Sequence, residues 1–426
     1  MEKITYPALD METYKTVLPS GLQVLLVRTP GFTKKTAYFV TSYGAIHTQF
    51  LCNGEKITTP AGVAHFLEHK IFDMPGGDIT AEFANLGASV NAFTSYDLTA
   101  YYFTCTDHFE KNLSLLLQFV TTPYFTRESV AKEQGIIGQE IDMVLDTPDT
   151  RVFENLMEAM YESHPIRVPI LGTQESIAQI TPEILQQCHR CFYRPENMLL
   201  CVLGDVEPEA VESCAMQLFS DKEPLQVEKM QTADEQMVCP QKKITRRMDV
   251  SMPMFHLGFK CEPAAQGEAG VRWETVGDLA AEWLFGESSE LYLQLYEQGL
   301  IDGSFGGGFE TVEGMAMLSC SGDSKNPEKV QAAILKQAKK LIKQGLSPEA
   351  FQRMKRSALG RRIRDLDSFS STAFRLCAYH FNGFDYLRFP EVYAAVEAEE
   401  LVEFIKQSVT PDRAALSIIY PCKEES

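Results

Sequence analysis

Apolar residues in the first half of the chain follow two periods, and each period predicts a different kind of element. Runs rich in β-branched and aromatic side chains, LQVLLVRT at 22–29 and TAYFVTSYG at 36–44, are bounded by Gly or Pro and predict strands. The segment SVNAFTSYDLTAYYFTCT at 89–106 predicts a strand pair, and NMLLCVLGDV at 197–206 predicts one more strand. Helical spacing predicts a helix that begins at residue 60 and others near 79–87, 107–121, 127–145, 150–163 and 181–192.

A polar stretch at 221–245 carries two prolines between apolar patterns, which predicts a linker between a first unit, 1–220, and a second unit, 246–426. The second half then repeats the order of elements. The run MFHLGFK resembles the strand at 36–44, GMAMLSCSG parallels AYYFTCTD, and AALSIIYP parallels MLLCVLGD. We therefore expect two homologous α/β units, which together make an α+β fold.

The stretch VAHFLEHKIF contains two histidines four residues apart, His65 and His69, with Glu68 directly before the second. Thr59 is the expected N-cap of this helix and Pro60 its first residue. Positions i and i+4 lie on one face of a helix, about 5–6 Å apart, so both imidazoles can hold one metal ion. Zinc suits such ligands, and a catalytic zinc usually has three protein ligands. The alternative is a structural helix with surface histidines.

A candidate for the third ligand lies on a helix downstream, in KEQGIIGQEIDMVLD. Glu133 and Glu140 are seven residues apart and return to nearly the same helical face. Taken alone, two such glutamates are typical of a solvated helix. The motif upstream favours metal ligation instead. The matching helix of the second unit has no histidine, so we expect that unit to keep the fold without the metal.

These residues resemble the pitrilysin and insulinase family of zinc peptidases with an inverted H-x-x-E-H motif. The likeness covers most of the chain: AGVAHFLEHKIF, LGASVNAFTSYDLTAYYF, KEQGIIGQEI, HPIRVPILGTQESIAQIT and FYRPENMLLCVLGDV. It points to the short-subunit branch that contains the mitochondrial processing peptidase. The resemblance implies the fold of the LuxS and processing-peptidase type, in which each unit packs a mainly antiparallel sheet against helices.

The resemblance also implies a role for each site residue. His65, His69 and Glu140 are expected to hold one Zn²⁺ per chain, with Glu68 as the general base beside it. Glu133 is expected to support His69 or the zinc from behind the ligands. This predicts a zinc endopeptidase that hydrolyses short or unfolded peptides.

The family likeness further implies that a peptide substrate adds as a strand along the edge formed by Asn91, Ala92 and Phe93. The residues alone also fit a plain strand start. In the second unit, the family's substrate-binding arginine and tyrosine are missing from SSELYLQLYEQGLIDG. Tyr296 stands at the position of the arginine, and Asp302 is near the expected position of the tyrosine. Either Tyr292 or Tyr296 substitutes, or a partner subunit supplies these groups, or transition-state stabilisation is weaker. Both tyrosines also fit a role as helix-core residues.

Composition limits the partners and the compartment. A net charge of −19 opposes nucleic acid and anionic membranes. No stretch has 18 consecutive apolar residues, and the 11 scattered cysteines are typical of reduced, buried thiols, so we expect a cytoplasmic protein. The pair Cys188 and Cys191 is expected to be structural. The basic run at 355–364 favours a solvated face over a site for a peptide carboxylate.

We expect a dimer, either a homodimer or a heterodimer with a related subunit, because this branch of the family pairs chains. The competing hypothesis is a non-proteolytic or partner-dependent subunit that acts as a scaffold or binds peptides. The complete set of His65, Glu68, His69 and Glu140 argues against a scaffold, whereas the missing arginine and tyrosine favour it.

Overall fold

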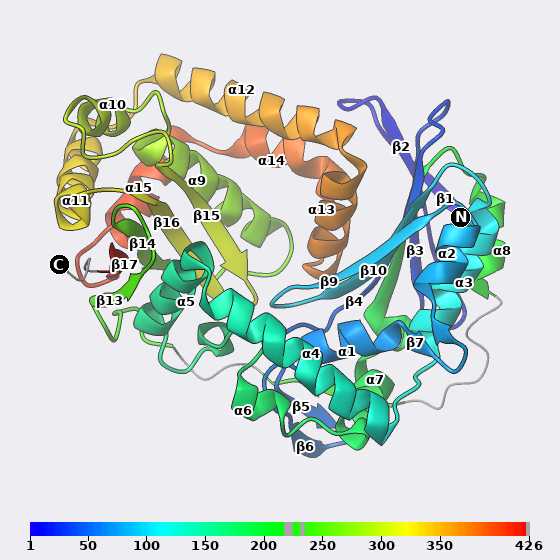
Figure 1. Ribbon diagram of the computed structural model, residues 1–426. Helices are drawn as coiled ribbons and strands as arrows, with labels where there is room; N and C mark the ends of the chain where they lie inside the picture. The colour runs from blue at the N-terminus through cyan, green and yellow to red at the C-terminus, as the bar shows by residue number, and fades with distance from the viewer. Residues whose placement is uncertain (217–224, 231–234, 423–426) are drawn as a thin grey trace. The chain divides into compact units, whose positions relative to one another are not determined.

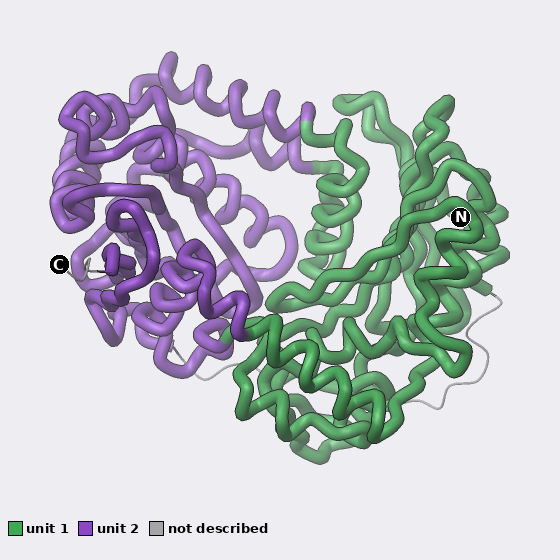
Figure 2. Tube along the Cα trace, viewed as in Figure 1, with its two compact units in different colours: residues 1–141, 169–230, 365–388 green, residues 142–168, 231–364, 389–426 purple. Residues whose placement is uncertain are grey.

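The computed structural model describes residues 1–216, 225–230 and 235–422. The chain forms two compact units (Figure 2). Unit 1 consists of residues 1–141, 169–230 and 365–388. Unit 2 consists of residues 142–168, 231–364 and 389–426.

A single boundary in the sequence does not separate the two units. The segment 142–168 comes from the first half of the sequence but belongs to unit 2, and 365–388 comes from the second half but belongs to unit 1. The expected division at 221–245 did not include this exchange. The expected linker lies partly outside the described residues, and its described part contains β12 (Val227–Lys229), which pairs with β5 (Gln49–Cys52) of unit 1.

Unit 1 is built on a seven-stranded sheet with the order β1-β2-β3-β11-β4-β10-β9 (Figure 1). Its strands are β1 (Glu2–Tyr6), β2 (Met11–Val17), β3 (Gln23–Arg28), β11 (Met198–Gly204), β4 (Lys35–Thr41), β10 (Thr99–Cys105) and β9 (Ser89–Thr94). Every pair is antiparallel except β3 with β11, which is parallel. Smaller strands complete the unit: β5 (Gln49–Cys52), β6 (Glu55–Thr58), β7 (Asp73–Met74) and β8 (Gly77–Asp78).

Helices cover both faces of this sheet (Figure 1). Helix α3 (Phe109–Thr121) packs on β4 and β10, and α8 (Pro208–Met216) packs against α3. On the other face lies α13 (Phe369–Phe381), from the exchanged segment, against β11 and β4. The remaining helices are α1 (Val63–Ile71), α2 (Thr80–Asn85), α4 (Arg127–Leu145), α6 (Gln174–Ile177) and α7 (Pro182–Phe192).

Unit 2 is built on a five-stranded sheet with the order β13-β17-β14-β16-β15. Its strands are β13 (Lys243–Met248), β17 (Ala414–Pro421), β14 (Met254–Cys261), β16 (Met315–Asp323) and β15 (Gly306–Val312). The exchanged helix α5 (Pro148–Met160) packs on β17 and β14. The other helices are α9 (Glu268–Phe285), α10 (Glu290–Glu297), α11 (Pro327–Gln344), α12 (Pro348–Arg364), α14 (Phe389–Ala395) and α15 (Ala398–Ser408).

The two sheets confirm the predicted repeat. The order β3-β11-β4-β10-β9 in unit 1 matches β13-β17-β14-β16-β15 in unit 2, and in each set only the first pair is parallel. The fold class, two units of mainly antiparallel sheet packed with helices, is therefore confirmed. Among the described residues, no helix combines the length and apolar composition that crossing a bilayer requires.

The start of α1 differs from the sequence-based expectation. The helix begins at Val63, and its N-cap is Gly62, which has a left-handed φ of 90° and offers no side-chain cap. Thr59 instead lies four residues earlier, where its hydroxyl donates to the Thr48 carbonyl. The prediction of Thr59 as N-cap and Pro60 as first residue was therefore wrong, because the chain turns at Gly62 before the helix begins.

Close backbone contact explains the glycine at this turn. A Cβ on Gly62 would lie 2.5 Å from the carbonyl oxygen of Leu171, and one on Gly172 would lie 2.6 Å from that of Ala61. The Ser176 hydroxyl also donates to the Ala61 carbonyl over 2.9 Å. The segment before α1 is therefore fixed against the loop at 171–172 by two glycines and one hydrogen bond.

The cysteine pair on α7 lies in the protein core, which agrees with the structural role expected for it. Cys188 and Cys191 are both buried, and the Cys191 sulfur lies 3.5 Å from that of Cys52. Burial raises the pKa of the Cys188 thiol to about 12, which keeps it protonated at neutral pH.

We predict that Gly62→Ala lowers the free energy of unfolding by about 2–4 kcal/mol, because an alanine must adopt φ near 90° and also meets the Leu171 carbonyl. Gly54→Ala is the matched control: φ is 82° and no atom lies within 4 Å of its Cβ, so only the backbone cost of about 1 kcal/mol applies. Chemical denaturation measures both. Equal losses would show that the contact with Leu171 is unimportant.

Candidate metal centre

Helix α1 is buried along most of its length. Seven of its nine residues are buried, including His65, and only Glu68 and His69 are half-buried. The apolar side chains of this helix, among them Phe66 and Leu67, pack into the core of unit 1. His65 and His69 are thereby fixed toward α4, and Glu68 toward β9.

The structure brings His65, His69 and Glu140 together. One ligand atom from each lies within 4.8 Å of the others, and among the described residues this is the group of three that could hold a metal ion. The Glu140 Oε2 atom is 3.7 Å from His65 Nε2 and 3.6 Å from His69 Nε2. Glu140 comes from α4 and the histidines from α1, so tertiary packing creates the cluster.

These distances fit ligands around an ion better than direct hydrogen bonds. A hydrogen bond would bring the atoms to about 2.7–3.2 Å. Four ligands at about 2.0–2.1 Å from a zinc ion, in a tetrahedron, lie about 3.3 Å apart. Glu140 Oε2 is buried with no hydrogen-bond partner among the described residues, which costs free energy unless a cation sits beside it. The donor set and this unpaired oxygen therefore fit zinc.

The surroundings keep His65 neutral and fix the orientation of the His69 ring. Burial, and next the neighbouring His69, lower the pKa of His65 to about 3, so His65 is neutral at pH 7. His69 Nδ1 lies 3.0 Å from Glu133 Oε1, and because a carboxylate only accepts, Nδ1 carries the proton and leaves the Nε2 lone pair directed at Glu140. Burial lowers the pKa of His69, but Glu133 outweighs this effect and the pKa is raised.

Glu68 lies beside the cluster without belonging to it. Burial raises the pKa of its carboxyl group, while a hydrogen bond from Thr94 opposes this shift. The Thr94 hydroxyl donates to Glu68 Oε2 over 2.6 Å. A carboxylate with a raised pKa can accept a proton and later release it.

Sequence reasoning missed Thr94. The sequence places Thr94 only in the predicted strand pair at 89–106, whereas the structure shows that its strand, β9, contacts α1. A signal existed in the alternation of that strand, which places the Thr94 side chain two positions after Ala92, on the same face. Without the packing of β9 on α1, that signal does not identify Glu68 as its partner.

Asn91, Ala92 and Phe93 lie on β9, which is the edge of the sheet in unit 1. Ser95 N donates to the Leu98 carbonyl at the turn, so by alternation Ala92 and Thr94 direct their N–H and C=O groups away from β10. The outward Ala92 N–H donates to Asn91 Oδ1 over 2.9 Å. Along the described part of the chain no strand pairs with this outer edge.

The other predicted binding residues lie in unit 2. Tyr292 and Tyr296 are on α10, with ring centroids 6.0 Å apart and nearly parallel planes. Tyr296 is 54% exposed, and the buried residues of α10 are Leu291 and Leu295. The structure thus does not support the helix-core alternative for Tyr296.

Comparison with known proteins agrees with this geometry. The model of the insulinase family (peptidase family M16) matches residues 57–174, and the model of the peptidase M16 inactive domain matches 179–358. The protein named uncharacterized zinc protease YmfH, from Bacillus subtilis, is 34% identical over 431 residues and aligns over 99% of both chains. The chain belongs to the insulinase family of peptidases, M16.

Other relatives of this M16 protein match over part or all of its length. The β subunit of the mitochondrial-processing peptidase from Caenorhabditis elegans is 28% identical over 215 residues, which is 49% of this chain and 45% of that protein. The crystal structure of an M16-like peptidase from Alicyclobacillus acidocaldarius is 31% identical, with a TM-score of 0.94 over 98% of this chain and 100% of that one. A Helicobacter pylori protease, 18% identical over 96% of this chain and 99% of that one, shares the fold with a TM-score of 0.81.

We predict that His69→Ala and Glu140→Gln each lower zinc affinity by at least about a hundredfold, because each removes a ligand. Glu133→Gln loses the charge behind His69 and lowers affinity by about 10–100-fold. Glu68→Gln leaves affinity nearly unchanged. Competition against a chromophoric chelator gives all four constants, and equal zinc binding by the His69, Glu140 and Glu68 variants would refute the ligand assignment.

Proposed function

We propose that this M16 protein is a zinc-dependent endopeptidase that hydrolyses short or unfolded peptides. One observation carries the proposal: the ligand atoms of His65, His69 and Glu140 converge beside a half-buried Glu68, whose carboxylate is hydrogen-bonded to the edge strand β9. Membership of a family whose relatives are named zinc proteases supports it. A purely structural protein gains nothing from a partly buried cluster in which the Glu140 oxygen has no hydrogen-bond partner among the described residues.

Zinc bound at this cluster would lower the pKa of its water toward neutrality and polarise the scissile carbonyl. Glu68 accepts the proton of the attacking water and delivers it to the leaving amine. Its raised pKa suits both steps, because the group must be basic first and acidic afterwards. Thr94 fixes the Glu68 carboxylate, and Glu133 fixes the His69 ring.

Substrate binds as an added strand on the outer edge of β9. The C=O groups of Ala92 and Thr94 and the N–H of Ala92 face outward and can pair with an extended peptide, which selects extended chains rather than a particular sequence. Without substrate, Asn91 Oδ1 accepts a hydrogen bond from the Ala92 N–H, and a bound peptide replaces Asn91 as the acceptor. Because Thr94 also bonds Glu68, a peptide on this edge passes next to the general base.

Unit 2 is proposed to contribute to substrate binding through the stacked, accessible rings of Tyr292 and Tyr296. The chain is proposed to work as a dimer, with itself or with a related subunit that supplies the missing arginine and tyrosine. One relative is named as the β subunit of a peptidase, which supports pairing of chains. The eleven free cysteines, nine of them buried, support a reducing compartment such as the cytoplasm.

The second candidate function is a partner-dependent subunit without activity of its own. The observation that favours it is Tyr296 at the position of the family's arginine, together with Asp302 near the position of the tyrosine. In the structure, Asp302 accepts hydrogen bonds from the backbone N–H and the hydroxyl of Ser304, so its side chain stabilises the local turn.

We predict that Glu68→Gln abolishes hydrolysis while keeping zinc, because the amide cannot accept the proton. Purified protein and variant are incubated with a complex peptide library, and new termini are read by mass spectrometry. Glu128→Gln, an exposed position at the start of α4, is the matched control and cuts like the parent. No cuts by a zinc-loaded parent would favour the partner-dependent subunit, and a mixture with the related subunit would then restore them.

We also predict that Ala92→Pro raises KM about 5–10-fold, because it removes one outward N–H that pairs with the peptide. The ladder to β10 does not use this N–H, so zinc affinity stays within about twofold of the parent. Steady-state kinetics on one fluorogenic peptide measures the change. An unchanged KM with normal kcat would contradict substrate binding on β9.

A further inference from the structure

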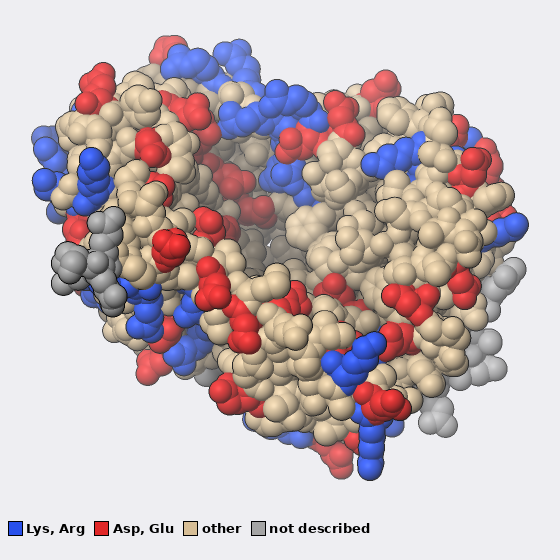
Figure 3. Space-filling view, in the orientation of Figure 1, with Lys and Arg blue, Asp and Glu red and all other residues tan. Residues whose placement is uncertain are grey.

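Positive charge is concentrated in one part of this acidic chain. Residues 327–364, which form α11 and α12 of unit 2, contain eleven of the 39 lysines and arginines but only two of the 58 acidic residues. This segment has a net charge of +9, and the remainder of the chain has a net charge of −28. Figure 3 shows blue side chains along α12 and over α11.

The lysines of α11 share one face of that helix. They recur at spacings of seven, three, one and three residues, which keeps them within about 100° around the axis. They are Lys329, Lys336, Lys339, Lys340 and Lys343. The opposite face is buried and includes Val330, Ile334 and Leu341. Lys340 is ion-paired with Glu290, whereas the other four have no ion pair among the described residues.

Three of the six basic residues of α12 form an inner set with partners within unit 2, among them Arg361, which is ion-paired with Glu282, and the other three form an outer set. Lys355 donates to the carbonyls of Ala394 and Val396, and Arg362 lies 3.7–3.8 Å from Asp278 and Glu274. These inner side chains hold α12 onto the unit. The outer set, Arg353, Arg356 and Arg364, is exposed, and within the described part of the chain it makes no ion pair.

This arrangement is unfavourable in the isolated chain. Like charges three or four residues apart on a helix repel, as Lys336 does with Lys339 and Lys339 with Lys343. A solvated helix face normally intersperses acidic residues, which turn this repulsion into attraction. The chain has acidic residues in excess, yet α11 has one, Glu328, and α12 has one, Glu349. The sequence therefore keeps a destabilising charge pattern that a partner of opposite charge would compensate.

We propose that the exposed basic faces of α11 and α12 form a docking surface for an acidic polypeptide segment. The surface is defined by Lys329, Lys336, Lys339 and Lys343 of α11 and Arg353, Arg356 and Arg364 of α12. The lysine face from 329 to 343 is about 21 Å long, the length of about six residues of extended chain. Carboxylates spaced along such a segment can pair with successive lysines and arginines. The docking surface lies in unit 2 and does not use the metal centre.

Two other polyanions fit less well. A single-stranded nucleic acid is normally held by aromatic side chains that stack on its bases, and the one aromatic residue of α11 and α12 is Phe351, which is buried. An anionic bilayer extends far beyond this surface and would face the charge of −28 on the remaining chain. A short acidic segment confines its charge to the basic faces and avoids that repulsion.

The test is fluorescence anisotropy of a labelled Glu- and Asp-rich peptide with the full chain. We expect binding that weakens strongly between about 50 and about 300 mM salt. The variant K336E/K339E/K343E is expected to lower affinity at least about tenfold, because three pairing sites are reversed. The matched control K56E/K111E/K132E places the same charge change on exposed lysines of unit 1 and is expected to keep affinity within about twofold.

Each outcome decides the proposal. Loss in the α11 variant with retention in the control supports it. No binding by the parent, or equal loss in both variants, overturns it, since net charge alone would then govern. Tighter binding of oligothymidine or of phosphatidylserine vesicles than of the peptide overturns the choice of an acidic polypeptide. Size-exclusion chromatography of the parent without peptide shows whether a second copy of the chain occupies the surface. A salt-sensitive dimer that is lost only in the α11 variant would overturn the acidic peptide as the occupant in favour of a second copy of this chain.

A single substitution separates docking from folding. Lys339→Glu places an acid one turn before Lys343 and beside Lys336, so repulsion becomes attraction and the Tm is expected to rise slightly. The same variant is expected to bind the acidic peptide less tightly than the parent. A lower Tm together with weaker binding would point to simple structural damage and count against the proposal.

Discussion

Burial of α1 is the constraint on which the site depends. Apolar residues hold this helix inside unit 1, and its polar side chains then need partners from the elements around it. Glu68 is bonded by Thr94 of β9, and the fully buried Lys70 is paired with Asp73 of β7. Each pairing ties α1 to a different neighbour, so the arrangement of the site is part of the packing of the unit.

The same constraint explains why the chemistry is directed toward α4. His69 is hydrogen-bonded to Glu133, and both histidines face the unpaired oxygen of Glu140 on the neighbouring helix α4. His65 Nδ1 has no hydrogen-bond partner among the described residues, so in this arrangement only its Nε2 faces a polar group, the Glu140 carboxylate. The packing of α1 thus brings the neutral imidazole of His65 and the ring of His69 within 4.8 Å of the Glu140 carboxylate of α4, while Glu68 lies on the same helix α1.

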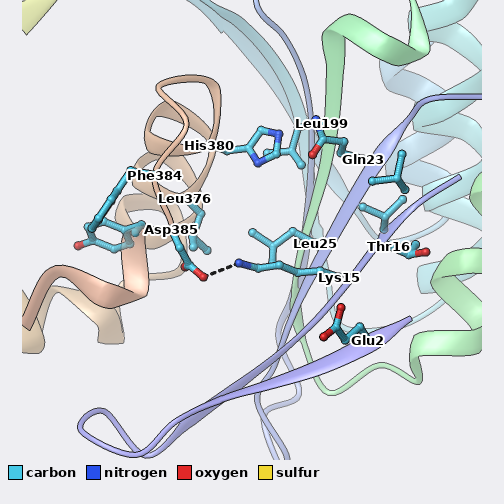
Figure 4. Close-up of a pocket in the computed structure, with 13 residues that line it drawn as sticks. Glu2, Lys15, Thr16, Gln23, Leu25, Leu199, Leu376, His380, Phe384 and Asp385 are labelled. Atoms are coloured by element: carbon cyan, nitrogen blue, oxygen red, sulfur yellow. Dashed lines mark hydrogen bonds and ion pairs between the residues drawn. The ribbon is translucent and has the colours of Figure 1, made fainter. Parts of the chain in front are cut away.

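The repeated fold shows how much architecture can be kept without the chemistry. Both sheets have the same strand order, and each is covered on one face by a helix from the other half of the sequence, α13 in unit 1 and α5 in unit 2. In unit 1 the incoming segment is anchored by Asp385, which accepts hydrogen bonds from Tyr6 and Lys15. Figure 4 shows the contact with Lys15 beside a cavity of ≈ 310 Å³. Contacts of this kind make the exchange part of each unit's core.

The sequence by itself determined the local features. The i, i+4 histidines on a helix, the strand runs and the repeated order of elements depend on short periods, which side-chain spacing records directly. Tertiary structure alone decided that Glu140 meets the histidines, that Thr94 holds Glu68, that Gly62 rather than Thr59 begins α1, and that segments 142–168 and 365–388 change units. Each of these depends on contacts between residues distant in the chain, and no local period encodes them.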